Sequence, residues 1–217
     1  MNNWLRIRQS LPADVRLIAV SKYHTVEQIA EAYAAGCRDF GESRVQELKV
    51  KQAVLPDDIH WHFIGHLQTN KVRDLLRLRP QLIQSVDSEH LLRVINAEAE
   101  KQGIVQDVLL EVHVAREETK SGLTVDELRQ LISDGAWQMA NVRISGLMAM
   151  ATNTDDEAEI RRCFRAAHEQ YTWLTDRLSA SRSPLSPLHL SMGMSDDYPI
   201  AISEGSTMVR IGSAIFD

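Results

Sequence analysis

The sequence predicts an α/β fold, a single (β/α)8 barrel of the TIM type with an extra helix before its first strand, spanning residues 1–217 as one domain. Short apolar runs alternate with amphipathic helical patterns along the whole chain, which favours a parallel sheet whose strands are joined by helices. Eight strand-like runs are present, each followed by a helical pattern, as in such a barrel. A doubly wound open sheet would ordinarily carry a glycine-rich turn after its first strand, whereas residues 22–25 read KYHT.

The first half of the chain supplies five of the predicted strands. Each is a short run rich in apolar and β-branched residues, and the four helical patterns between them each end at a glycine or a proline. An amphipathic pattern at residues 1–9 predicts the extra helix, and Thr25 is the expected N-cap of the first helix inside the barrel unit. The strands are predicted at residues 16–22, 39–43, 60–65, 82–88 and 106–114, and the helices at 25–36, 44–55, 69–79 and 89–103.

The second half of the chain supplies three more strands. A capping box formed by Thr124 and Glu127 opens the first helix of this half. Residues 179–187 read SASRSPLSP, a composition typical of a loop between a helix and a strand. The strands are predicted at residues 142–152, 188–194 and 208–217, and the helices at 124–139, 155–178 and 196–206.

Composition and charge exclude several classes of protein. The net charge of −6 argues against a protein whose main activity is binding the phosphate backbone of nucleic acids. No apolar run reaches membrane-spanning length and no signal-peptide pattern is present, so we expect a cytoplasmic protein with no membrane partner. The acidic surface favours a monomer.

Metal ligands are scarce in the sequence. Cys37 and Cys163 lack the spacing of a metal site and are interpreted as reduced structural thiols. His60 and His62 would share one face of the third strand, but no third ligand accompanies them, so we expect no metal.

Lys22 follows the first predicted strand and stands at a junction of strand and helix. In a parallel α/β fold, catalytic groups and cofactors collect at the carboxyl ends of the strands. A lysine there would meet an electrophile or an anion. The alternative is that Lys22 ends the strand and extends into water.

Small residues near the ends of the last two strands favour an anion site. Loops after strands 7 and 8 of a barrel frequently bind phosphate, because small residues let an oxyanion approach the backbone amides. Tight turns and helix caps would explain the same residues equally well. The residues are Ser191, Gly193 and Ser195 from the seventh segment, and Gly212 and Ser213 from the eighth.

Arg210 interrupts the apolar eighth strand, and a charge that faces inward there needs a partner or a ligand. A lysine, a phosphate site and an inward arginine together suggest pyridoxal 5′-phosphate (PLP), with Lys22 for the aldimine and Arg210 for the ring nitrogen. A different class of function would be a sugar-phosphate enzyme that forms a Schiff base on Lys22, with Asp87 as its acid or base. A role as a helix cap is the alternative for Asp87.

Eight motifs, in order along nearly the whole chain, resemble the pyridoxal phosphate homeostasis protein family. They are AVSK, FGESRVQE, HWHFIGHLQTNK, SVDS, VAREETKSG, GLMAMAT, LSMGMSDD and STMVRIGSAIF. That family is similar in fold to the barrel domain of alanine racemase and of fold-type III PLP enzymes. The resemblance therefore implies a fold-type III PLP-binding barrel that takes part in intracellular PLP (vitamin B6) homeostasis.

The resemblance also implies roles for individual residues. Lys22 would carry PLP as an aldimine, and Arg210 would face the pyridine nitrogen. Because arginine stays protonated and cannot give the ring a proton, the bound cofactor would be a weak electron sink. The residues that would hold the phosphate are Ser191, Gly212 and Ser213.

Other positions match the family with roles that stay open. Met148 would line the ring face together with Met150, although core packing explains both equally well. Ser43 stands where many members of the family carry asparagine. Lys71 and Lys120 lie in matching motifs, where solvated side chains are an equal explanation.

We expect a PLP carrier with little or no turnover, whose partners are PLP-dependent apo-enzymes or PLP-forming enzymes. Alanine racemase-type enzymes use a second β-domain that supplies another acid or base, and the sequence shows none after its eighth predicted strand. The alternative is a small PLP-dependent amino-acid racemase, in which Lys22 acts on one face of the cofactor and Tyr23, His62 or a water acts on the other. We place His62 among the cofactor-binding residues.

Overall fold

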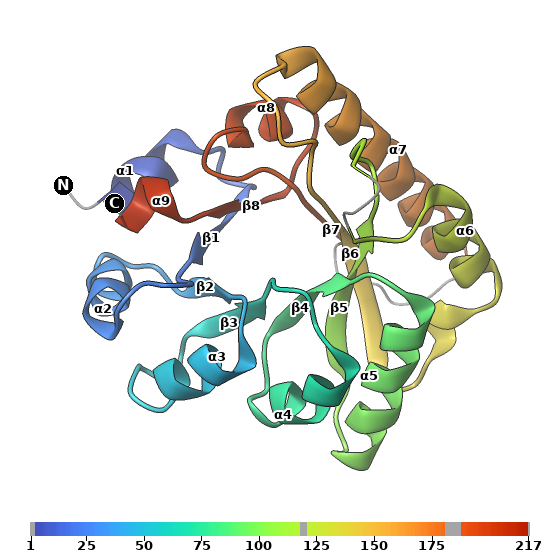
Figure 1. The fold of residues 1–217 in the computed structure, drawn as a ribbon, viewed down its shortest axis with the longest axis horizontal. Helices are drawn as coiled ribbons and strands as arrows, with labels where there is room; N and C mark the ends of the chain where they lie inside the picture. The colour runs from blue at the N-terminus through green and yellow to red at the C-terminus, as the bar shows by residue number, and fades with distance from the viewer. Residues whose placement is uncertain (1–2, 118–120, 181–187, 217) are drawn as a thin grey trace.

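The computed structural model describes residues 3–117, 121–180 and 188–216, in which eight parallel strands close into a barrel. The strands follow one another in chain order around the barrel. They form an inner ring with the helices outside it (Figure 1), which confirms the predicted fold. The strands are β1 (Arg16–Val20), β2 (Asp39–Glu42), β3 (His60–Phe63), β4 (Leu82–Val86), β5 (Gln106–Val112), β6 (Val142–Ala149), β7 (His189–Ser191) and β8 (Met208–Ile211).

The two helices with predicted capping residues, Thr25 and Thr124, begin directly after those residues. The Thr25 hydroxyl accepts a hydrogen bond from the amide of Gln28, and Thr124 and Glu127 form the expected capping box. The helices are α1 (Asn3–Ser10), α2 (Val26–Ala34), α3 (Val45–Gln52), α4 (Val72–Arg77), α5 (Glu89–Lys101), α6 (Val125–Ser133), α7 (Glu157–Ala180), α8 (Tyr198–Ser203) and α9 (Ser213–Phe216), with 3-10 turns η1 (Thr69–Lys71) and η2 (Ala136–Gln138).

Most predicted elements end a few residues early, and two end six residues earlier than the sequence suggests. The helix expected at 124–139 ends at Ser133, because Gly135 adopts a left-handed conformation (φ 83°) and a separate 3-10 turn follows it. The strand expected at 208–217 ends at Ile211, and α9 replaces its second half. Most of the predicted loop at 179–187 lies outside the described residues, and α7 covers its first two positions.

The apolar core has two parts. A large cluster fills the space between the outer faces of the strands and the helices. A much smaller cluster contains apolar side chains that face the barrel interior. The interior is therefore only partly apolar, which leaves room for polar side chains. The fully or nearly fully buried members of the inner cluster are Ile18, Leu82, Leu109, Met148 and Met208.

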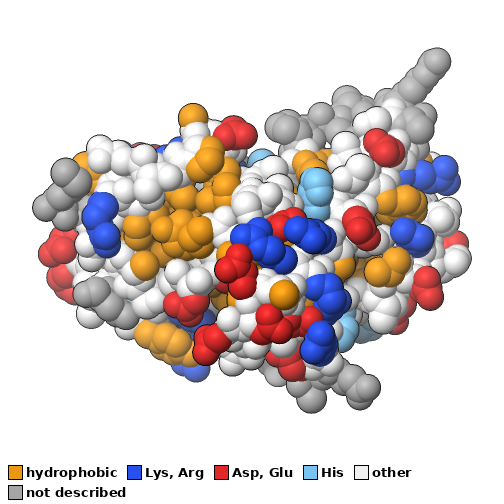
Figure 2. Space-filling view, turned by 90° about the horizontal axis from the view of Figure 1, so that it is seen from above, with side chains coloured by type: hydrophobic (Ala, Val, Ile, Leu, Met, Phe, Trp, Pro, Cys, Tyr) orange, Lys and Arg blue, Asp and Glu red, His pale blue; other side chains and the backbone are white. Residues whose placement is uncertain are grey.

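Charged side chains of both signs share the face that carries α7 and α8. Figure 2 shows acidic and basic groups interleaved across the middle of this face. Arg161 contacts Glu157 and Glu204, and Arg165 contacts Glu204 at 2.9 Å. Among the described residues, no helix is both long enough and apolar enough to cross a membrane.

Replacing Gly146 by alanine should destabilise the protein far more than replacing Gly103. Both glycines adopt positive φ angles. The 62° of Gly103 costs an alanine about 1 kcal/mol, whereas the 134° of Gly146 lies outside the left-handed region and costs an alanine more. A Cβ at Gly146 would also lie 2.6 Å from the backbone nitrogen of His189 in β7, whereas a Cβ at Gly103 meets nothing within 4 Å. We expect Gly146→Ala to lose about 3 kcal/mol or more. Urea unfolding measures both losses, and equal losses would show that contact with β7 contributes nothing.

Candidate functional site

A cavity of about 530 Å³ lies at the carboxyl ends of the strands. It brings together Lys22, Arg210, Gly212, Ser213 and Ser43 of the residues predicted for the site. Residues from the ends of β1, β3, β6 and β7, or from the turns after them, complete its wall. They are Val20, Tyr23, His24, Ile64, Met150, Met194, Ser195 and Asp196.

Lys22 is exposed on the wall of this cavity, two residues beyond the end of β1. The next residue, Tyr23, has a left-handed φ of 68° and is 73% exposed, so the chain turns sharply here before α2 begins. The Lys22 Nζ atom lies 5.9 Å from the centroid of the Tyr23 ring. The amine is thus presented to the cavity by a tight turn and lies beside an aromatic ring.

A buried ion pair holds the backbone just before Lys22. The ammonium of Lys51 contacts Oε1 of Glu42 and donates a hydrogen bond to the carbonyl oxygen of Ser21 at 2.8 Å. The Ser21 hydroxyl also donates to Glu42 Oε1, at 2.8 Å. Glu42 is fully buried and Lys51 is nearly so. These contacts link α3, β2 and the end of β1, and they fix the residue that precedes Lys22.

Arg210 is the buried cation of the site. Its Nη1 atom donates to the hydroxyl and the carbonyl oxygen of Ser191, at 2.6 and 2.9 Å, and its Nη2 atom donates to the carbonyl oxygen of Ala149 at 3.1 Å. Burial lowers the pKa of Arg210 to about 10, and the carboxylates of Glu111 and Asp197 oppose that change. The guanidinium therefore keeps its charge at neutral pH.

Three predicted site residues lie deeper in the barrel than the cavity. The hydroxyl of Ser191 already bonds to Arg210 and to Gln84, and binding a phosphate would require it to leave those partners. His62 is fully buried against Gln84, and burial lowers the pKa of its imidazole, which stays neutral. Met148 packs in the inner cluster. None of the three is among the described residues that line the cavity.

The segments after β7 and β8 are tied together beside Lys22. The amide of Gly212 donates to the Ser195 hydroxyl at 3.4 Å, and the amide of Arg210 donates to the carbonyl oxygen of Gly193 at 3.0 Å. A Cβ at Gly212 would lie 3.3 Å from the Cβ and carbonyl oxygen of Val20, so this glycine lets β8 approach β1 closely. Asp197 is the N-cap residue of α8. Ser195 bonds across to β8 and does not cap that helix.

Glu111 is a residue that the sequence reasoning missed. It is 4% exposed near the end of β5. Burial raises the pKa of Glu111 to about 7, the Asp87 carboxylate adds to that rise, and the Arg210 guanidinium opposes it. The sequence contains an indication of this position, because a glutamate within the apolar run VLLEV is as unusual as the arginine within MVRI.

The structure describes one of the two lysines whose roles the sequence leaves open, Lys71 and Lys120. Lys71 lines a small cavity of about 230 Å³ that also includes Ser43 and His66. Lys120 lies outside the described residues.

His60 and His62 share one face of β3, as expected, and both contact Asp39 there, at 3.3 and 3.2 Å.

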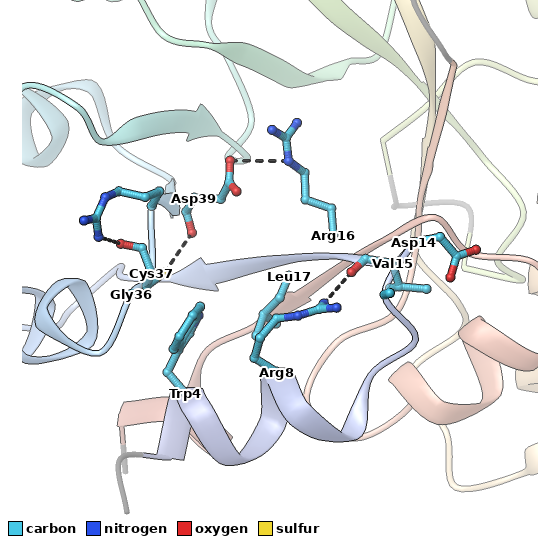
Figure 3. Close-up of a pocket in the computed structure, with 11 residues that line it drawn as sticks. Trp4, Arg8, Asp14, Val15, Arg16, Leu17, Gly36, Cys37 and Asp39 are labelled. Atoms are coloured by element: carbon cyan, nitrogen blue, oxygen red, sulfur yellow. Dashed lines mark hydrogen bonds and ion pairs between the residues drawn. The ribbon is translucent and has the colours of Figure 1, made fainter.

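A second cavity, of about 390 Å³, lies at the opposite end of the barrel, beside the first residues of β1 and β2 (Figure 3). Its arginines are engaged by the protein itself. Arg8 donates to the carbonyl oxygens of Val15 and Pro12, and Arg16 contacts Asp39 at 3.4 Å. These arginines therefore do not assemble an evident anion site.

Comparison with known proteins identifies the family. The family model described as "Alanine racemase, N-terminal domain" matches residues 1–217. The pyridoxal phosphate homeostasis protein of Aquifex aeolicus is 42% identical over 202 residues, which cover 93% of this chain and 86% of that protein. The chain belongs to the pyridoxal phosphate homeostasis protein family. The resemblance seen in the sequence motifs is thereby confirmed.

Solved structures agree with membership of this family. The structure of PipY of Synechococcus elongatus PCC7942 with PLP bound is 37% identical, has a TM-score of 0.89, and is matched over 99% of this chain and 98% of that one. The alanine racemase of Streptomyces coelicolor A3(2) is 19% identical with a TM-score of 0.76, and the match covers 98% of this chain but 56% of that enzyme. The second likeness shows a shared barrel fold.

Breaking the buried ion pair between Lys51 and Glu42 should destabilise the folded protein. In Lys51→Met, the Glu42 carboxylate stays buried without its cation, and we expect a loss of roughly 3 to 5 kcal/mol in the free energy of unfolding. Adding Glu42→Gln should recover a large part of that loss, since no buried charge is then left alone. Lys49→Met, at an exposed position of the same helix, is the control. A loss in Lys51→Met no larger than in this control would contradict the assignment.

Glu111 should make the protein less stable as pH rises. Between the ordinary pKa of 4.5 in the unfolded chain and about 7 in the folded protein, the folded state binds more protons, so the free energy of unfolding falls as pH rises through this window. We expect Glu111→Gln to be more stable than the parent protein at pH 8, and its advantage to be about 2 kcal/mol larger there than at pH 5. Urea unfolding at both pH values measures this, with the exposed Glu89→Gln as control. An advantage independent of pH would contradict it.

Proposed function

We propose that this protein binds PLP through Lys22 and carries the cofactor without consuming it. The observation that carries the proposal is the convergence of an exposed primary amine, Lys22, and a buried cation, Arg210, on one cavity. PLP supplies an aldehyde that condenses reversibly with a primary amine. PipY, whose structure contains PLP, shares this fold and 37% of its residues with the chain.

The residues of the cavity fit the chemistry of PLP. The volume of about 530 Å³ lies in the range of small-molecule sites. Lys22 provides the amine, and Arg210 is a donor with no acceptor, which suits an unprotonated ring nitrogen. The Ser195 and Ser213 hydroxyls and the backbone at Gly212 are suited to hold a phosphate, because they combine donors with close backbone approach. Met150 and Ile64 supply apolar contact for the ring.

Carriage is favoured over racemisation by the positions of three candidate bases, His62, Tyr23 and Glu111. A racemase needs an acid or base on the face of the cofactor opposite Lys22. His62 lies buried below the cavity, and Tyr23 lies beside Lys22 itself. Glu111 is not among the described residues lining the cavity. Lys22 is therefore suited to exchange the cofactor with incoming amines, such as those of PLP-dependent apo-enzymes. We propose that this exchange takes place in the cytoplasm on a monomer.

Lys22→Ala should abolish covalent attachment of PLP. The protein loaded with PLP should show a visible absorption band that borohydride removes, and peptide mass mapping should then place the added mass on the peptide that contains Lys22. Lys49→Ala, which changes an exposed lysine of α3, should behave like the parent protein.

Three outcomes would contradict the proposed function. An unmodified Lys22 in the parent protein after reduction would remove the assigned attachment point, and a protein that takes up no PLP would exclude the carrier role. Rapid loss of α-deuterium from both enantiomers of alanine would replace carriage by racemisation. Sedimentation of the purified protein checks the monomer.

A further inference from the structure

A row of hydrogen-bonded polar side chains crosses the interior of the barrel. Arg210 Nη1 donates to the Ser191 hydroxyl at 2.6 Å, and that hydroxyl donates to Gln84 Oε1 at 2.7 Å. Gln84 Nε2 lies 3.1 Å from Nδ1 of His62, whose Nε2 lies 3.2 Å from Asp39 Oδ1. Four of these five residues are buried, and Asp39 is partly so. They come from β8, β7, β4, β3 and β2.

The chemistry of the two ends sets the direction of every hydrogen bond in this row. A guanidinium only donates, so the Ser191 hydroxyl oxygen accepts a hydrogen bond from Arg210. The Ser191 hydroxyl group in turn donates a hydrogen bond to Gln84 Oε1. A carboxylate only accepts, so Asp39 accepts a hydrogen bond from the N–H group at His62 Nε2. His62 Nδ1 then accepts from the Gln84 amide nitrogen. The glutamine thus has one possible orientation, and all four bonds point from the cation toward the anion.

Bonds that point the same way strengthen one another, because each donor is polarised by the acceptor beyond it. The low pKa of the buried His62 imidazole is consistent with this arrangement, since a neutral ring donates from one nitrogen and accepts at the other. Figure 3 shows the far end of the row, where the Asp39 carboxylate also meets Arg16. The row therefore runs from the cavity that contains Lys22 to the opposite end of the barrel.

We infer that Asp39, His62 and Gln84 are positioning residues that hold the Arg210 guanidinium in place for the cofactor. The inference rests on the proposed function for the identity of that ligand. Arg210 has five N–H groups, and three are used in bonds to Ser191 and Ala149 within the described residues. Two donors remain for a ligand. A guanidinium fixed before the ligand arrives lowers the ordering cost of binding.

Gln84→Met tests the middle link of the row with little change in volume. The matched control is Gln106→Met, which removes a buried glutamine of β5 that bonds only to the carbonyl oxygens of Pro80 and Asp107 in the described residues. Nitrogen NMR of the protein without PLP should show His62 protonated at Nε2 and sharp guanidinium signals for Arg210. Gln84→Met should broaden the Arg210 signals and mix the tautomers of His62, whereas Gln106→Met should change neither.

PLP binding gives the second readout. We expect the dissociation constant for PLP to rise about tenfold in Gln84→Met and to stay within about twofold of the parent value in Gln106→Met. The absorption band of the bound cofactor should shift in Gln84→Met only, because its ring would face a differently placed guanidinium. A loss of stability alone would move neither the tautomer of His62 nor this band.

Ser191→Ala removes the hydrogen bond of the row next to Arg210. It is the second test variant if Gln84→Met does not fold. It should broaden the Arg210 signals while His62, still bonded to Gln84 and Asp39, keeps its single tautomer. His62 protonated at Nδ1 in the parent protein, or Arg210 signals in both variants equal to those of Gln106→Met, would overturn the inference. A parent protein that binds no PLP would instead overturn the proposed function, because the NMR test needs no cofactor.

Discussion

The structure is organised around a guanidinium buried inside a parallel barrel. An isolated charge in such a place costs several kcal/mol unless dipoles or counter-charges surround it. Among the described residues Arg210 makes no ion pair within bonding distance, and its partners are two strand carbonyls and one hydroxyl. Those partners belong to β6 and β7, so the guanidinium ties three neighbouring strands together. The same need explains why the interior carries a polar row where an ordinary barrel would carry branched apolar residues.

The two cations that face the cavity are supported in opposite ways. Arg210 is held directly, by bonds to its own side chain, and it is 5% exposed. Lys22 is held indirectly, because the buried Lys51 and Glu42 fix the backbone at Ser21 while the amine itself stays in solvent. A fixed cation can orient a ligand, and a free amine can react and release it. The division of labour follows from one side chain lying within a strand and the other lying in a turn beyond it.

Much of the fold could be predicted because the alternating strands and helices of a barrel give the sequence a periodic pattern. Strand runs buried on both faces alternate with amphipathic helices, and the lysine after the first run and the arginine within the last stand out against that pattern. The sequence pattern does not show how deep in the barrel a side chain lies. For this reason Ser191, His62 and Met148 are predicted at the cavity but lie below it. Gln84 and Glu111 were missed although the sequence marks both. Each is a polar residue inside an apolar strand, the same signal that marks Arg210.

The exposed and buried halves of the site suit the reversible loading of a cofactor better than chemistry on a bound substrate. Acid-base catalysis needs a proton-transfer group that reaches the reacting atoms, and two of the candidate groups, His62 and Glu111, lie inside the barrel among other side chains. The charge of Glu111 acts on Arg210, and neither Glu111 nor His62 is among the described residues that line the cavity with Lys22. An exposed Lys22 amine beside an enclosed His62 and Glu111 is the arrangement that the proposed carrier needs, because the amine has to release the cofactor to other amines.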